Sequence, residues 1–181
     1  MFFLKSRQKN RRHAFLWLAF IYGTLPVARP ICENLRQMLP FSLFINSVMM
    51  IALIVAVVTT CRRIPIHKLS SFFILGPTIF SYLSLLWIIK VPEERIHFLE
   101  YAILGVLIEG ALRIEKKIFL TYVLTILLTS FLGWIDEVIQ HYLPGRYFDW
   151  RDVLFNALGG ILGIVLVFIV QRETTKETDA L

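Results

Sequence analysis

The sequence predicts an all-α integral membrane protein, a polytopic transmembrane helical bundle of about six spans. The first observation is composition: of 181 residues, 57% are hydrophobic and 18% are charged, with a mean hydropathy of +0.68, a balance that soluble domains seldom reach. The second is that the apolar residues fall into runs close to the roughly 20 residues that a helix needs to cross a bilayer core. The predicted spans are residues 14–30, 40–61, 69–89, 96–112, 118–135 and 153–170.

The first three runs differ in how closely they match a membrane-spanning helix. The first is short, contains Pro26 and follows a basic segment, so it also resembles the start of a secretory signal peptide. A signal peptide needs a small-residue cleavage site, whereas Arg29 and Pro30 follow here, so we expect an uncleaved helix. The second and third runs are long and uncharged, and Pro77 should kink the third helix without ending it because lipid-embedded helices tolerate proline.

The last three runs carry charged residues at their ends. The fourth starts beside Glu93–Arg95, the fifth stops before Asp136, and the sixth starts after Asp152. Pro144 and Gly145 should end the fifth helix and turn the chain. The polar tail that follows the sixth run, residues 171–181, should be frayed.

The distribution of basic residues predicts the orientation of the chain. Outside the spans, 13 Lys and Arg residues fall on the side of the two termini and six on the other side. By the positive-inside rule both termini are cytoplasmic. The basic residues alternate with apolar spans, so the net charge of +6 does not indicate nucleic-acid binding. Cys32 and Cys61 fall on opposite faces in this topology and should not pair.

Three polar stretches meet the predicted outer face, where burying a charge is costly unless it is paired or hydrated. The first opens the fourth helix with His97, Glu100 and Tyr101. Their spacings of three and four residues place them on one helical face, directed toward a common neighbour. An interfacial belt, in which His and Tyr side chains reach the headgroups, would give the same pattern.

The second stretch ends the fifth helix. Asp136 and Gln140, and likewise Glu137 and His141, are four residues apart, which predicts two polar pairs on adjoining faces. Carboxylates near a helix C-terminus oppose the macrodipole and need a partner cation. Arg146 is the local candidate, and its guanidinium fork could hold a carboxylate or a phosphate oxygen.

The third stretch enters the sixth helix. Asp149 is a natural N-cap, a structural role that explains it as well as a functional one does, and Asp152 falls in the first turn. Asn156 lies one turn deeper and should hydrogen-bond to another helix. Gly159 and Gly163 share its face with the GxxxG spacing that lets a neighbouring backbone approach, so the sixth helix should pack inward along it.

Glu109 lies inside the fourth run toward its cytoplasmic end. Arg113 follows four residues later, so we expect an ion pair that reaches the interface. A proton or ion path is the weaker interpretation because Glu109 alone would continue it through the inner half.

In order along the chain, these motifs resemble the VanZ-like family. Many relatives carry an Asp-Lys pair ahead of the histidine, where this chain has Glu93 and Glu94. The resemblance divides the chain into a basic tail with three helices at 1–92, a VanZ-like three-helix core at 93–170 and a polar tail at 171–181. The matching pieces are residues 96–105, 136–140 and 143–146, with Asp149, Asp152, Asn156, Gly159, Gly160 and Gly163.

The resemblance implies a multi-pass protein of the bacterial cell membrane and a role at the cell envelope. The family takes its name from an antibiotic-resistance protein that lowers sensitivity to the glycopeptide teicoplanin. The partners implied are membrane lipid and a lipid-linked envelope precursor or a lipoglycopeptide. The oligomeric state stays open.

Two hypotheses of different class follow. The favoured one is a binder in which the polar residues form a buried network that recognises a headgroup or a lipid tail. The alternative is a membrane enzyme, since carboxylates beside a histidine in a site of low dielectric can transfer protons. We expect no cofactor, and a metal site of His97, Glu137 and His141 matches no standard zinc spacing. The candidate catalytic residues are His97, Glu100, Asp136 and Glu137, and the candidate binding residues are Tyr101, Gln140, Arg146, Asp149, Asp152 and Asn156.

Overall fold

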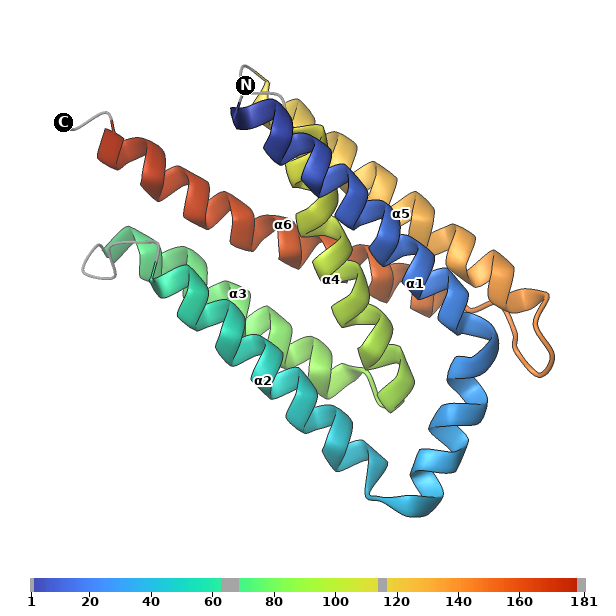
Figure 1. Cartoon of the computed structure of the whole chain (residues 1–181). Helices are drawn as coiled ribbons and strands as arrows, with labels where there is room; N and C mark the ends of the chain where they lie inside the picture. The colour runs from blue at the N-terminus through green and yellow to red at the C-terminus, as the bar shows by residue number, and fades with distance from the viewer. Residues whose placement is uncertain (1, 63–68, 114–116, 179–181) are drawn as a thin grey trace.

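Six α-helices joined by short connections form the chain in the computed structural model, which describes residues 2–62, 69–113 and 117–178 (Figure 1). The predicted all-α fold and the six helices are confirmed. The helices are α1 (Phe2–Met38), α2 (Phe41–Cys61), α3 (Leu69–Ile88), α4 (Pro92–Leu112), α5 (Ile118–His141) and α6 (Trp150–Thr178).

Four helices have the length and composition of membrane spans: Arg7–Met38 in α1, all of α2, all of α5, and Trp150–Gln171 in α6. The apolar segment Leu75–Ile88 of α3 is shorter. α4 has 21 residues but carries five charged side chains along its length. The protein therefore crosses the membrane several times. Of the six predicted spans, 96–112 in α4 contains the most charged residues, Glu100 and Glu109.

α1 is longer than the predicted first span and continues through Pro26 and Pro30. It bends in its second half (Figure 1), as expected where proline removes a helical hydrogen bond and its ring clashes with the preceding turn. At about 1.5 Å per residue, its 37 residues exceed the roughly 40–45 Å of a bilayer with its headgroups. The charged last turns of α1 can therefore extend beyond the hydrocarbon region.

The last three helices also differ from their predicted bounds. α4 begins at Pro92, which occupies the first turn, where its missing N–H has no helical partner to lose. α5 continues six residues past the predicted end at 135, because only the turn at Gly145, with φ of +71°, reverses the chain. The predicted fraying is wrong for residues 171–178, which continue α6, and residues 179–181 lie outside the described chain.

α4 and α6 cross in direct backbone contact at the predicted glycine face. A Cβ atom on Gly159 would lie under 3.0 Å from the carbonyl oxygen of Phe98, and one on Gly163 would lie equally close to that of Ala102. Real Cβ atoms essentially never approach other atoms so closely. The GxxxG prediction is confirmed, and this crossing is the centre of the bundle.

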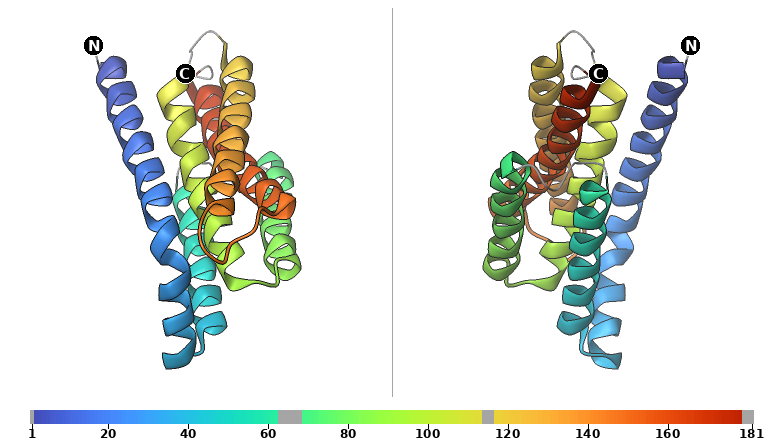
Figure 2. Two further views of the ribbon diagram at one scale, coloured as in Figure 1. Left: turned by 90° about the vertical axis from the view of Figure 1, so that its right-hand side faces the viewer. Right: turned by 90° about the vertical axis from the view of Figure 1, so that its left-hand side faces the viewer.

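α1 covers α4 and α5 on one side of this crossing. The Trp17 indole N–H donates to the backbone oxygen of Glu100 at 2.9 Å, and the Tyr22 hydroxyl donates to that of Leu132 at 2.8 Å. Both chain termini lie at the same end of the bundle (Figure 2). That this end is cytoplasmic stays a prediction from the loop charges.

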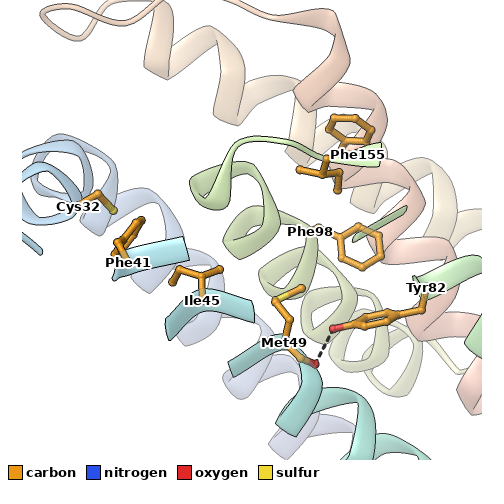
Figure 3. Close-up of a cluster of buried hydrophobic side chains, with 8 residues drawn as sticks. Cys32, Phe41, Ile45, Met49, Tyr82, Phe98 and Phe155 are labelled. Carbon is orange, nitrogen blue, oxygen red and sulfur yellow. Dashed lines mark hydrogen bonds between the residues drawn. The ribbon is translucent and has the colours of Figure 1, made fainter. Parts of the chain in front are cut away.

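The α2–α3 hairpin covers α4 and α6 on the other side. Figure 3 shows the buried cluster that joins them, in which the Tyr82 hydroxyl donates to the backbone oxygen of Met49 at 2.9 Å. The Tyr82 and Phe98 rings are 5.5 Å apart between centroids. Cys32 is buried in this cluster, and the thiols of Cys32 and Cys61 are both free.

Candidate functional site

The first two polar stretches meet where α4 begins and α5 ends. Asp136 is fully buried, and its Oδ2 accepts a hydrogen bond from the Tyr101 hydroxyl at 3.2 Å. The same oxygen lies 3.6 Å from Nδ1 of His97, which is also 3.2 Å from Oε2 of Glu100. The convergence predicted for this face of α4 is confirmed. We call His97, Glu100, Tyr101, Asp136, Glu137 and Gln140 the polar core.

Gln140 links the two carboxylates of α5. Its Nε2 donates to Oε1 of Glu137 at 2.9 Å and to Oδ1 of Asp136 at 3.4 Å. The predicted pairing of Asp136 with Gln140 is confirmed. The predicted pair of Glu137 with His141 is wrong, because His141 is exposed and packs its ring edge against Tyr142.

Arg146 reaches the polar core through an amide. Its Nη1 donates to Oε1 of Gln140, so within the described residues its hydrogen-bond partner is neutral rather than the carboxylate we expected. Gln140 thereby presents its oxygen to the cation and its N–H groups to Asp136 and Glu137. The arginine charge is held beside the polar core without forming an ion pair within it.

Asp149 caps α6 as predicted. Its Oδ1 accepts from the backbone N–H of Arg151 at 2.7 Å, the geometry of an N-cap. Its own backbone N–H donates to Oε2 of Glu137 at 3.2 Å, which ties the loop after α5 to the polar core. Asp152 lies in the first turn of α6, and its buried Oδ1 has no hydrogen-bond partner among the described residues.

Asn156 lies at the site, but its amide differs from the prediction. It is fully buried and packs tightly on α5, since a Cβ atom on Gly133 would lie 2.8 Å from the Asn156 Cβ. The predicted hydrogen bond to another helix is wrong: neither atom of its amide has a partner within the described parts of the chain. An unpaired buried amide costs about 1–3 kcal/mol, so its retention needs a reason other than stability.

Replacing Asn156 with leucine tests whether the amide stabilises the fold. We expect Asn156→Leu to leave the thermal unfolding midpoint of the detergent-purified chain unchanged or slightly raised, because an unpaired polar group is exchanged for an apolar one. A fall of more than about 4 °C, corresponding to roughly 1 kcal/mol or more, would instead show that the amide holds the bundle together. Differential scanning fluorimetry distinguishes these results.

Glu94 adds a further unsatisfied acceptor. It precedes the apolar part of α4, and its buried Oε2 has no hydrogen-bond partner within the described chain, although Nη2 of Arg151 lies 3.9 Å away. Burial raises the pKa of the Glu94 carboxyl, and the neighbouring Asp152 raises it further.

Sequence reasoning missed two arginines of the site, Arg29 and Arg36, which share a cavity with Arg146. Arg29 and Arg36 lie seven residues apart on α1, a spacing that puts both on one face of a helix and could have identified them. With Arg146 they form what we call the arginine rim, and they line a cavity of about 260 Å³. The other residues of this cavity are Glu33, Val91 and Glu93.

The ion pairs of the arginine rim are exposed. Nη2 of Arg36 donates to both oxygens of Glu93 at 2.7 Å, and Nε of Arg29 donates to Glu33 at 2.9 Å. The two arginine side chains are 50% and 49% exposed. Exposed pairs contribute about 0–1 kcal/mol, so both arginines can exchange these partners for a stronger anion.

The expected ion pair of Glu109 is not formed. Glu109 is 3% exposed, and in the described part of the chain its carboxylate accepts a hydrogen bond from Nε2 of Gln171 at 2.9 Å. Helix α6 thus reaches further toward the termini than the sequence indicated and covers this carboxylate. Among the described residues, no three His, Cys, Asp or Glu side chains are arranged to hold a metal ion.

Comparison with known proteins identifies the family. Residues 3–171 match the family described as VanZ/LLP1, so the similarity includes α1, α2 and α3 and is not confined to the three-helix core at 93–170. No curated protein and no solved structure matches the chain. With most of its length matched and several helices able to span a membrane, the chain belongs to the VanZ/LLP1 family of integral membrane proteins.

Proposed function

We propose that this protein binds a lipid-linked component of the cell envelope, with a phosphate group on the arginine rim and the polar headgroup against the polar core. One observation carries the proposal: Arg29, Arg36 and Arg146, from two distant parts of the chain, line one cavity. Guanidinium groups present paired donors that match phosphate oxygens. A lipid-linked precursor combines such an anion with a membrane-bound tail.

Two features make the arginine rim available to a ligand. The pairs of Arg29 and Arg36 with glutamates are exposed and exchangeable. Arg146 donates to the neutral amide of Gln140, so among the described residues its charge is not paired with a carboxylate. A phosphate on the rim would lie next to a network that already orients one of its three donors.

The polar core supplies the complement for the rest of the headgroup. Three of its six residues are carboxylates, and Asp152 and Asn156 on α6 have buried atoms without hydrogen-bond partners in the described residues. Hydroxyl and amine groups, as on sugars and amino acids, are the donors that such acceptors take. This proposal favours a glycosylated or peptide-bearing headgroup over a simple phosphate.

Binding of a polyprenyl diphosphate to the full-length protein in nanodiscs tests the arginine rim. We expect Arg146→Ala and Arg36→Ala each to weaken binding by about tenfold, the lower bound for a hydrogen bond to a charged group. Lys90→Ala is the matched control, because Lys90 stacks on the Trp87 ring at 4.6 Å and does not line the cavity. Equal affinities for all three variants and the wild type, by native mass spectrometry, would contradict the proposal.

The family name also supports a cellular role, a lowered sensitivity to teicoplanin. In cells that lack the gene, complementation with the wild type should restore tolerance, and His97→Ala, Glu137→Gln or Arg146→Ala should not. Membrane levels of each variant are measured alongside. Loss of tolerance in variants that remain abundant supports the site, and tolerance that is independent of the gene rejects this role.

One geometric observation favours a second function, a membrane enzyme. His97 Nδ1 lies within 3.6 Å of carboxylates from two helices, an arrangement suited to proton transfer. Mass spectra of lipid-linked species from the same strains separate the two functions. A binder changes the amounts of existing species, whereas an enzyme produces a new species that disappears with His97→Ala.

A further inference from the structure

A second cavity lies on the other face of the α4–α6 crossing, beneath the α2–α3 hairpin. Its volume is about 290 Å³, and its walls are almost wholly apolar. Along α4 it extends from Phe98 to Val106, and Ala56 of α2 and Leu166 of α6 also line it. It shares no residue with the cavity of the arginine rim.

This apolar cavity continues into a polar one of about 510 Å³ at the end of the bundle that holds the termini. The two share Ala56, Val106 and Leu166. From Phe98 to Arg113 they follow α4 for about 22 Å at 1.5 Å per residue. One leaflet of a bilayer core is roughly 15 Å thick, half of about 30 Å, so the joined cavities are longer than one leaflet is thick. The polar residues of the second cavity are Asn10, Thr59, Thr60, Glu109, Arg113 and Gln171.

The polar cavity holds opposite charges at fixed places. Glu109 is 3% exposed and accepts from Gln171, whose Oε1 in turn accepts from the Tyr122 hydroxyl at 2.9 Å. Arg113 lines the same cavity and is exposed. Among the described residues, Gln171 is the one hydrogen-bond donor to the Glu109 carboxylate. A buried carboxylate is costly unless a cation or further donors reach it, and the arginine offers a site for an anion.

We infer that the joined cavities bind a zwitterionic phospholipid of the phosphatidylethanolamine type. One acyl chain lies between the α2–α3 hairpin and the α4–α6 pair. The phosphate contacts Arg113, and the ammonium contacts Glu109. This site is independent of the proposed function, because it uses other residues and its headgroup lies at the opposite end of the bundle.

A lipid is the occupant that the shape and the lining of this space favour. A single acyl chain is thin and flexible enough to enter between packed helices. The change from an apolar to a polar lining along one continuous space also matches an amphiphile.

Photocrosslinking tests the inference with a phosphatidylethanolamine that carries a diazirine in its acyl chain. The full-length protein is reconstituted in vesicles of phosphatidylethanolamine and phosphatidylglycerol, irradiated and mapped by mass spectrometry. We expect adducts to concentrate on the cavity walls formed by α2, α4 and α6. An even spread over the exposed helix faces would show bulk lipid contact only and would overturn the site.

Paired variants control for changes in folding. Ala56→Trp fills the apolar section and should lower the cavity adducts at least fivefold, whereas Ile54→Trp, on the exposed face of the same helix, should leave them unchanged. Glu109→Gln can still accept from Gln171 and should abolish the preference for phosphatidylethanolamine over a phosphatidylglycerol probe. A diazirine fatty acid that labels the same walls as strongly would assign the cavity to any acyl chain and overturn the headgroup part.

Discussion

A Gly163→Leu variant should be clearly less stable than the wild type. The added side chain would meet the backbone of Ala102, which cannot move aside as a flexible side chain can. Overpacking of this kind costs up to about 3 kcal/mol, equivalent to a fall of roughly 6–12 °C in the unfolding midpoint for a chain of this size. Thermal unfolding in detergent, read by size-exclusion chromatography, measures the effect.

Gly76→Leu is the matched control for that experiment. Gly76 is also a glycine within a helix, but a Cβ atom there would meet nothing within 4 Å. Its substitution by leucine should therefore change the midpoint by no more than about 2–4 °C, corresponding to roughly 1 kcal/mol. Equal losses in the two variants would mean that the glycine contact between α4 and α6 does not hold the fold.

An Asp136→Ala variant should lose both stability and ligand binding. Asp136 accepts from Tyr101 and Gln140 and faces His97 from a fully buried position. Each buried group left unpaired costs about 1–3 kcal/mol, so we expect the midpoint to fall by several degrees. Because Gln140 orients Arg146, affinity for a polyprenyl diphosphate should fall as well.

Two asparagine variants separate charge from shape in this second prediction. Asp136→Asn keeps an acceptor for Tyr101 and should retain most of the stability while losing the charge that faces His97. Asp149→Asn retains the N-cap, because Asn and Asp cap equally well, and should resemble the wild type in both assays. If Asp136→Ala unfolds and binds as the wild type does, the polar core has neither role.

Much of the fold follows from local patterns in the sequence. Apolar runs located all six helices, and the GxxxG spacing identified the face of α6 that packs on α4. Helix ends were harder to predict because polar residues do not terminate a helix. Asp136 and Gln140 stay helical and become buried only because α4 and α6 cover them.

In the candidate site, too, features within one helix were predicted, and features that depend on packing between helices were not. Spacing along one helix predicted the shared face of His97 and Tyr101, and cap chemistry predicted the role of Asp149. Arg29 and Arg36 were missed because their relation to Arg146 arises from packing between helices. The amide of Asn156 shows the same limit, since depth in an apolar run indicates burial but not which partner, if any, is in reach.

The central position of α4 has a consequence for how the chain is assembled. α4 packs against α1, α2, α5 and α6. These helices separate Glu100 and Glu109 of α4 from lipid. Charged residues strongly oppose transfer of an isolated helix from the translocon into lipid. Since α6 is synthesised after α4, we expect stable insertion of α4 to follow the synthesis of α6.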